Sequence, residues 1–246
     1  MYVIYRKFGK TVEITEYERK PKKVRVHSTR KRGATYGLRR PDNIRRTRKI
    51  CMRRVSSALE ELGSPLLVSL TFRGDASDAS YANDSLRYFQ VRLRAEFPEA
   101  QSLFIPELSP RGRIHFHGLL FNVPLSLGDT RIGRKRLQDG MERKTRVLAG
   151  LWGEGFVDAL KADGSPKLAS YISKYITKGG GQIIFNAMRL LRISHGFPRE
   201  IVVRDELVAG KLRDKYATQK PDKEWEGGKE FAVFLGKITK KTYYLK

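Results

Sequence analysis

Two apolar stretches, residues 102–108 and 113–121, flank the turn sequence Ser109-Pro-Arg-Gly112, and this pairing constrains the fold more than any other feature. Proline and glycine suit a tight turn, so we expect an antiparallel β-hairpin. Further strands are expected at 65–72 and 155–160, and helices at 43–62, 80–97 and 165–178, from periodicity and stop signals. This mixture predicts an α+β fold with a central antiparallel β-sheet and flanking helices.

The second stretch carries two of the four histidines, His115 and His117. Alternate side chains of a strand share a face, so both imidazoles can bind one divalent metal ion. Glu107 is the expected third ligand, and this set leaves positions for a phosphate oxygen and water. Because directly paired residues share a face, Glu107 can join His115 only if the hairpin loop has an odd length or contains a bulge. Magnesium or manganese is the expected ion.

The segment 171–178, Tyr-Ile-Ser-Lys-Tyr-Ile-Thr-Lys, holds two tyrosines one helical turn apart. Helical spacing gathers two phenols and two ammonium groups on one face, and these belong to Tyr171, Lys174, Tyr175 and Lys178. An adjoining apolar stripe can anchor the helix through Leu168, Ala169, Ile172 and Ile176. A phenol attacks phosphate when its proton is removed or its anion is stabilised by cations. The lysines could supply that field, hold the phosphate or protonate the departing oxygen, and the sequence does not separate these roles.

Taken singly, each pattern has an ordinary structural explanation. A histidine pair two residues apart is more often a core or surface pair, and two tyrosines four apart more often line the edge of an amphipathic helix. The two patterns gain weight only when they occur together.

Basic side chains outnumber acidic ones by 50 to 26, and the formal net charge of +24 indicates a polyanionic partner, with nucleic acid foremost. The excess is concentrated in residues 1–56, which carry 19 basic and 4 acidic side chains. We therefore predict a DNA-contacting basic arm and helix at 1–56, a catalytic core at 57–200 and a C-terminal extension at 201–246.

The single cysteine, Cys51, excludes an intramolecular disulfide and a multi-cysteine zinc site. The apolar patch at residues 1–10 is too short for a signal peptide, and no run of about 18 apolar residues marks a membrane span. We expect a soluble protein of the cytoplasm with no membrane partner.

Three motifs, in this order, resemble those of the HUH endonucleases, and most closely the replication initiators of small single-stranded DNA phages of the microvirus type. Residues 68–72 resemble the first motif, His115-Phe-His117 the metal motif and residues 171–178 the nucleophile motif. Residues 152–158, Trp-Gly-Glu-Gly-Phe-Val-Asp, are also similar to the family. The resemblance covers roughly residues 64–200, and the ordered set is more specific than any member.

This resemblance implies an HUH/RRM-like fold with the histidines on the central strand and the tyrosine helix across that face. It implies that one tyrosine attacks the phosphate at an origin in single-stranded DNA, which leaves a 5′-phosphotyrosine and a free 3′-hydroxyl for rolling-circle synthesis. The second tyrosine later transfers and rejoins the strand. Because no helicase module is recognisable, a host helicase and replication machinery are expected as partners, in the cytoplasm of a bacterial host.

Other functions stay open. A metal nuclease that uses activated water would leave no covalent intermediate. A transposase or plasmid-mobilising relaxase would share the chemistry in another biological role, although paired tyrosines on one helix favour the replication type. A non-enzymatic, basic DNA-binding protein would require the histidines and tyrosines to coincide by chance.

Overall fold

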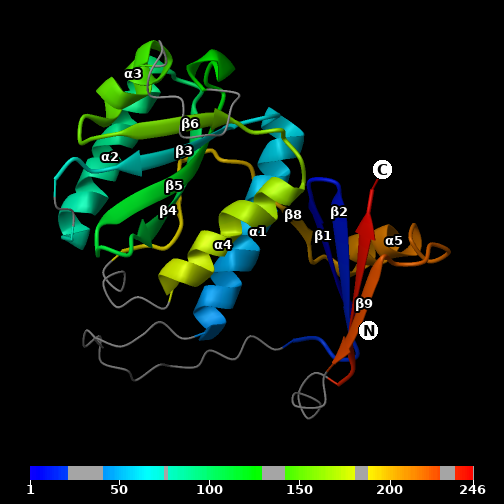
Figure 1. Ribbon diagram of the computed structural model, residues 1–246. Coiled ribbons are helices and arrows are strands. Elements are labelled where there is room, and N and C mark those ends of the chain that lie inside the picture. The colour runs from blue at the N-terminus through cyan, green and yellow to red at the C-terminus, as the bar shows by residue number, and fades with distance from the viewer. Residues whose placement is uncertain (22–40, 75–76, 129–141, 181–187, 228–235, 246) are drawn as a thin grey trace. The chain divides into compact units, whose positions relative to one another are not determined.

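The computed structural model describes residues 1–21, 41–74, 77–128, 142–180, 188–227 and 236–245 (Figure 1). The chain divides into two compact units, one drawn from both of its ends, 1–34 and 199–246, and one from 35–198. Among the described residues each unit contains an antiparallel five-stranded sheet, and helices accompany both sheets. The fold is therefore α+β with a central antiparallel sheet, as the sequence predicted.

The larger unit is built on a sheet with the strand order β6-β3-β5-β4-β7, so β5 is its central strand. Its strands are β3 (Leu66–Thr71), β4 (Gln101–Leu108), β5 (Ile114–Phe121), β6 (Val157–Lys161) and β7 (Arg192–Ile193). Each neighbouring pair is antiparallel. The four strands expected from the sequence are confirmed to within two residues at each end, and β7 is an addition.

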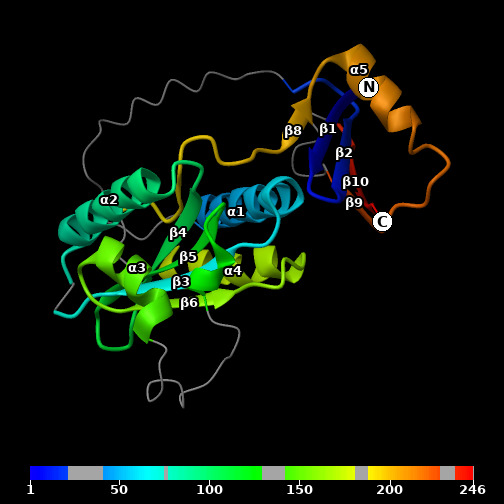
Figure 2. The same ribbon diagram turned by 90° about the horizontal axis from the view of Figure 1, so that it is seen from above.

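Helices cover both faces of this sheet. In chain order they are α1 (Pro41–Leu62), α2 (Ala79–Glu96), the single 3-10 turn η1 (Leu125–Leu127), α3 (Glu142–Trp152) and α4 (Lys167–Gly180). Figure 2 shows α2 and α3 on one side of the sheet and α1 and α4 on the other. The helix expected to start at Asn43 begins at Pro41, because proline suits the first helical position. None of the helices in the described ranges is long and apolar enough to cross a membrane.

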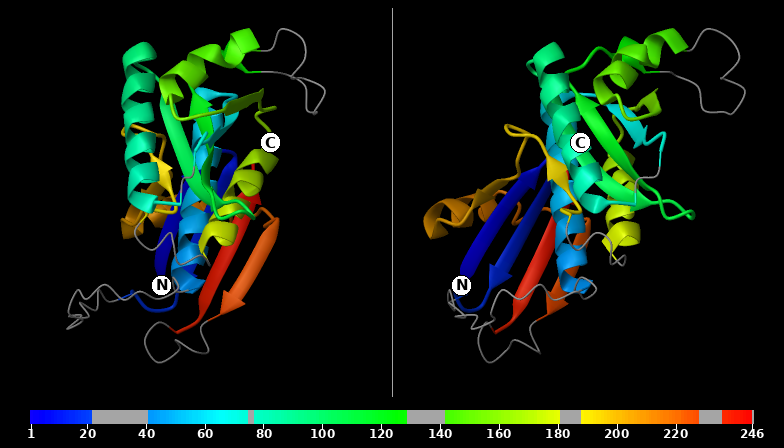
Figure 3. Two further views of the ribbon diagram at one scale, coloured as in Figure 1. Left: turned by 60° about the vertical axis from the view of Figure 1, so that its left-hand side comes forward. Right: turned by 90° about the vertical axis from the view of Figure 1, so that its left-hand side faces the viewer.

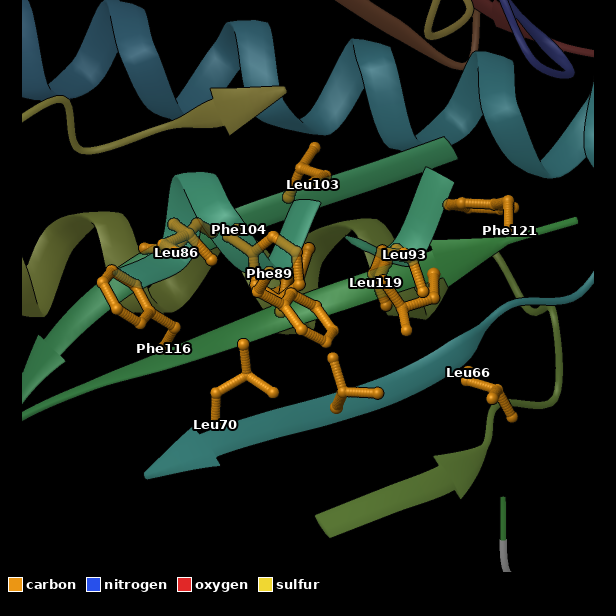
Figure 4. Close-up of a cluster of buried hydrophobic side chains, with 14 of the residues drawn as sticks. Leu66, Leu70, Leu86, Phe89, Leu93, Leu103, Phe104, Phe116, Leu119 and Phe121 are labelled. Atoms are coloured by element: carbon orange, nitrogen blue, oxygen red, sulfur yellow. The ribbon is translucent and has the colours of Figure 1, made fainter. Parts of the chain in front are cut away.

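The core lies between the sheet and α2 with α3. Along β3 the side chains of Leu66, Val68 and Leu70 are buried, whereas the residues between them are only half buried. Phe89 of α2 packs edge-on against both Phe104 and Trp152, with ring centres 5.8 Å apart in each pair (Figure 4). Aromatic burial of this kind holds one face of the sheet firmly. The opposite face carries the polar residues of β3 and β5.

Gly118 on β5 makes room for this core. A β carbon at Gly118 would lie 2.3 Å from two ring carbons of Phe104 and 2.8 Å from the carbonyl oxygen of Leu103. Because overpacking a core forces side chains to shift, we expect Gly118→Ala to lower the free energy of unfolding by about 1–3 kcal/mol. Urea denaturation measures this change. Gly150→Ala on α3, where an added β carbon meets nothing within 4 Å, is the control and should not destabilise. Equal losses in the two variants would contradict the argument.

The smaller unit has the strand order β8-β1-β2-β10-β9. Its elements are β1 (Tyr2–Phe8), β2 (Thr11–Tyr17), β8 (Ile201–Val203), α5 (Glu206–Asp214), β9 (Lys223–Gly227) and β10 (Ile238–Tyr244). Figure 3 shows β1 and β2, in blue, beside β10, in red, and Tyr17 pairs with Ile238. Asp205 caps α5 by accepting hydrogen bonds from the backbone N–H groups of Leu207 and Val208. A small core joins α5 to the sheet through Val3, Tyr5, Val12, Ile14, Ala209 and Tyr243.

The two ends of the chain thus share one sheet. For the N-terminal residues the sequence left open an extended arm or peripheral strands, and the described part forms two strands. The expected terminal strand pair is confirmed by the pairing of β9 with β10. Nothing in the local sequence pattern indicated that β2 pairs with β10. The boundaries at residues 56 and 200 and the DNA-contacting role of residues 1–56 stay predictions.

Candidate metal and tyrosine site

Glu107, His115 and His117 come together on the face of the larger sheet that α4 covers. Their ligand atoms all lie within 4.8 Å of one another. Glu107 Oε2 is 2.6 Å from His117 Nε2 and 3.2 Å from His115 Nε2, and the two imidazole rings are nearly perpendicular. One carboxylate oxygen therefore stands between two imidazole nitrogens.

The hairpin register satisfies the condition that the sequence set for Glu107. Glu107 is paired directly with His115, and Leu108 with Ile114, so residues 109–113 form the loop. A five-residue loop is odd in length, which places Glu107 and His115 on one face. Gly112 in this loop has φ +77°, a conformation that glycine adopts without strain. The expected turn ended at Gly112, and Arg113 is the extra residue that brings the carboxylate to the histidines.

The chemistry of these three residues fits a divalent metal ion. Imidazole nitrogen and carboxylate oxygen are common ligands of such ions, but this mixed set does not single out one metal. Burial and the neighbouring His115 lower the pKa of His117 and favour its neutral form, despite the adjacent carboxylate. Burial raises the pKa of Glu107, but hydrogen bonds from Lys178 and His117 outweigh it and leave that pKa below its usual value. A neutral imidazole and an ionised carboxylate are the forms that bind metal.

Ser69 on β3 orients His117, and sequence reasoning missed this role. Ser69 pairs with His117 across the two strands, and its Oγ lies 3.1 Å from His117 Nδ1. A hydroxyl can donate or accept, so Ser69 can support either tautomer of the ring. The available signal was the alternation along residues 66–71, which put Ser69 and Thr71 on the polar face, but the strand's partner was unknown.

Removing the Ser69 hydroxyl should weaken metal binding at His117. Partners of metal-bound histidines typically contribute about 10–100-fold to affinity, and we expect a loss of that size in Ser69→Ala. Titration of Mn²⁺ by isothermal calorimetry measures it. Ser102→Ala is the matched control, since Ser102 on β4 bonds to Gln90 of α2 on the opposite face. An unchanged affinity in Ser69→Ala would mean that packing alone orients His117.

Helix α4 is anchored by its apolar stripe, as the sequence predicted. Leu168, Ala169, Ile172 and Ile176 are all buried, and α4 packs on β4, β5 and α1. The fully buried Ser173 adds a polar contact, because its Oγ is 3.4 Å from Arg48 Nε of α1 and donates to the carbonyl of Ser170. The anchored stripe turns the two tyrosines toward the histidines.

Tyr175 stacks on His117, with ring centres 3.8 Å apart and an angle of 16° between the ring planes. Its hydroxyl lies 3.0 Å from that of Tyr171, which is 41% exposed. Burial raises the pKa of Tyr175, and the hydrogen bond with Tyr171 and the charge of Glu107 raise it further. Without additional positive charge, the Tyr175 phenol therefore keeps its proton.

The two lysines each accompany one tyrosine. Lys174 Nζ lies 5.9 Å from the ring centre of Tyr171, and Lys178 Nζ lies 5.4 Å from that of Tyr175. Lys178 also donates to Glu107 Oε1 at 3.2 Å while its side chain stays 64% exposed. Lys178 thus links the carboxylate with the tyrosine helix and remains accessible to a phosphate from solvent.

The fold and these residues define a candidate metal centre beside a pair of phenols on an antiparallel sheet. Residues 65–180 match the family model of the replication-associated protein ORF2. This segment is slightly less than half of the chain and contains every residue of the site. The match supports a role as a replication initiator. No curated protein and no solved structure gives a significant match.

Proposed function

We propose that this protein is a rolling-circle replication initiator of HUH type that nicks and rejoins single-stranded DNA through a 5′-phosphotyrosine. One observation carries the proposal above all: Tyr175 stacks on His117, so a potential nucleophile and the candidate metal ligands belong to one site. The match to replication-associated proteins supports the same biological role.

In the proposed reaction a tyrosine hydroxyl oxygen attacks a phosphodiester phosphorus. A bond forms between the phenol oxygen and phosphorus, and the bond from phosphorus to the 3′ oxygen breaks. The phenol loses its proton and the departing 3′ oxygen gains one, so the number of phosphodiester bonds is unchanged and no nucleotide triphosphate is consumed. A later attack by the second hydroxyl, 3.0 Å from the first, can pass the strand on for rejoining.

Glu107, His115 and His117 would hold a divalent ion, with Mg²⁺ or Mn²⁺ as the expected species. When bound, the ion supplies Lewis-acid polarisation of the phosphate. Ser69 keeps the His117 ring oriented, and Lys178 bridges Glu107 and Tyr175. The exposed Lys174 and Lys178 can bind the phosphate or stabilise a phenolate, which offsets the raised pKa of Tyr175.

The proposed partners follow from this chemistry and from the net charge of +24. They are single-stranded and origin DNA, a host helicase that separates the strands, and the host replication machinery in a bacterial cytoplasm. Backbone contacts by basic residues would make DNA binding strongly dependent on salt concentration.

A covalent adduct assay tests the proposal. Overlapping single-stranded fragments of the DNA element that encodes the protein are labelled at either end, incubated with protein and Mn²⁺, and separated on a denaturing gel. A 5′-phosphotyrosine retains the 3′-labelled segment on the protein, whereas the 5′-labelled segment is released with an extendable 3′-hydroxyl. EDTA should abolish both products, and protease should convert the adduct to a short DNA–peptide species.

Two other outcomes would reject the proposal in different ways. DNA cut in a metal-dependent manner without any adduct would indicate a nuclease that uses water, with tyrosines that only contact bases. Binding of every fragment with no cleavage across the complete element would indicate a non-enzymatic DNA-binding protein.

A further inference from the structure

Phe156 lies in the same row of residues as the candidate metal ligands. Phe156 is opposite Thr71, because the Thr71 N–H donates to its carbonyl oxygen at 2.9 Å and the next pair, Leu70 and Val157, belongs to the β3–β6 ladder. Thr71 pairs with His115, and His115 pairs with Glu107. Since paired residues share a face, the row Phe156, Thr71, His115 and Glu107 crosses the sheet on one face.

The Phe156 side chain is 71% exposed, although phenylalanine is usually buried. It stands just before β6, at the edge of the sheet (Figure 1). Neighbouring strands are about 4.8 Å apart, so two strand spacings separate it from His115, or roughly 10 Å. An accessible aromatic ring thus flanks the site on the side away from β4.

The backbone around Phe156 is held in place. Thr71 donates twice to the Phe156 carbonyl oxygen, through its N–H and through Oγ1 at 3.1 Å. At the preceding Gly155, a β carbon would lie 2.4 Å from the carbonyl oxygen of Thr71, so the two backbones are in close contact. Arg73 N donates to the carbonyl oxygen of Glu154 at 2.8 Å. A ligand that binds the ring therefore meets an ordered backbone and loses little entropy by fixing it.

We propose that Phe156 is the platform on which an unpaired nucleobase stacks, within a few nucleotides of the phosphate that the tyrosines attack. The proposal rests on the proposed function, which brings a DNA strand to Glu107, His115 and the tyrosines. A strand held there by its phosphate extends its bases along the same face, and Phe156 is an exposed aromatic ring in that row. Base–aromatic stacking needs an unpaired base and tolerates any sequence.

The platform accounts for a preference for single-stranded over duplex DNA near the cut. A base that is paired cannot present its face to the ring without leaving the duplex. The cationic groups of the site, Lys174 and Lys178, attract phosphate in either form of DNA and do not discriminate in this way. Phe156 is therefore a positioning and specificity residue, and it takes no part in the bond changes.

The test uses the full chain in EDTA and a 20-nucleotide thymidine oligomer that contains 5-iododeoxyuridine. Irradiation links the iodinated base to an aromatic ring stacked on it, and mass spectrometry of the peptides locates the link. Fluorescence anisotropy gives the Kd at several salt concentrations for wild type, Phe156→Ala and Phe156→Trp. The control is Tyr88→Ala, because Tyr88 is an exposed aromatic residue on α2, which covers the opposite face.

We expect the cross-link at Phe156 and a Kd about 5- to 150-fold higher in Phe156→Ala, with an unchanged dependence on salt. Phe156→Trp should retain tight binding, and Tyr88→Ala should match wild type. A wild-type Kd in Phe156→Ala, or links only at other aromatic residues, would overturn the proposal. A loss accompanied by a reduced salt slope would also overturn it, since that marks lost phosphate contacts. Because the metal-dependent adduct is measured separately, loss of the platform and failure of the nicking mechanism give different results.

Discussion

The double variant Tyr171→Phe/Tyr175→Phe is expected to form no covalent DNA adduct, with a loss of at least about 10³-fold relative to wild type. The physical reason is that both hydroxyls, 3.0 Å apart, are removed while both rings remain. The stacking of residue 175 on His117 should survive, so the metal ligands keep their orientation. The end-labelled adduct assay, with circular dichroism to verify folding, measures the effect.

The single variants divide the reaction into its two steps. Since the hydroxyls lie so close together, either Tyr171→Phe or Tyr175→Phe should still form an adduct with single-stranded DNA. Neither should transfer the bound strand efficiently to a second, differently labelled origin fragment, because that step needs the remaining phenol. An adduct in the double variant would place the nucleophile elsewhere, and full transfer by both single variants would remove the reason for a pair.

Loss of a metal ligand is the second large effect. Replacing Glu107 or His117 with alanine should lower Mn²⁺ affinity by at least about 100-fold, beyond the effect of a supporting residue such as Ser69. Either variant should also lose the adduct at Mn²⁺ concentrations that saturate wild type. Calorimetric titration and the adduct assay, run on the same preparations, link the two properties.

Asp158→Ala is the matched control for the metal ligands. Asp158 is an exposed carboxylate whose strand partner is Ser69, so it lies on the same face but outside the cluster. Its removal should leave both affinity and adduct yield near wild type. If Asp158→Ala weakened Mn²⁺ binding as much as Glu107→Ala does, general negative charge rather than a defined ligand set would hold the ion.

Local pattern was sufficient for most of the larger unit. Alternation along residues 66–71 predicted which side chains are buried, and the 3.6-residue period predicted the buried stripe of α4. These predictions succeeded because burial of one face or one stripe imposes a period that is visible in a single segment. The same periods put His115 with His117, and Tyr171 with Tyr175, on common faces.

Relations between segments were less accessible. The sequence stated the condition for Glu107 to reach His115, but whether the loop has four or five residues depends on where each strand ends in the folded hairpin. Ser69 was known to face the polar side, yet its contact with His117 required the pairing of β3 with β5. Phe156 joined the site only through the pairing of β3 with the start of β6.

The sequence by itself therefore determined the two histidines, the two tyrosines, the strong positive charge and the α+β character of the chain. Tertiary structure decided that Tyr175 stacks on His117, that Lys178 donates to Glu107, and that β2 and β10, more than 200 residues apart in the chain, share a sheet. The physical reason is that periodicity reports which face of a segment is buried, whereas strand partners and register follow from packing among distant segments.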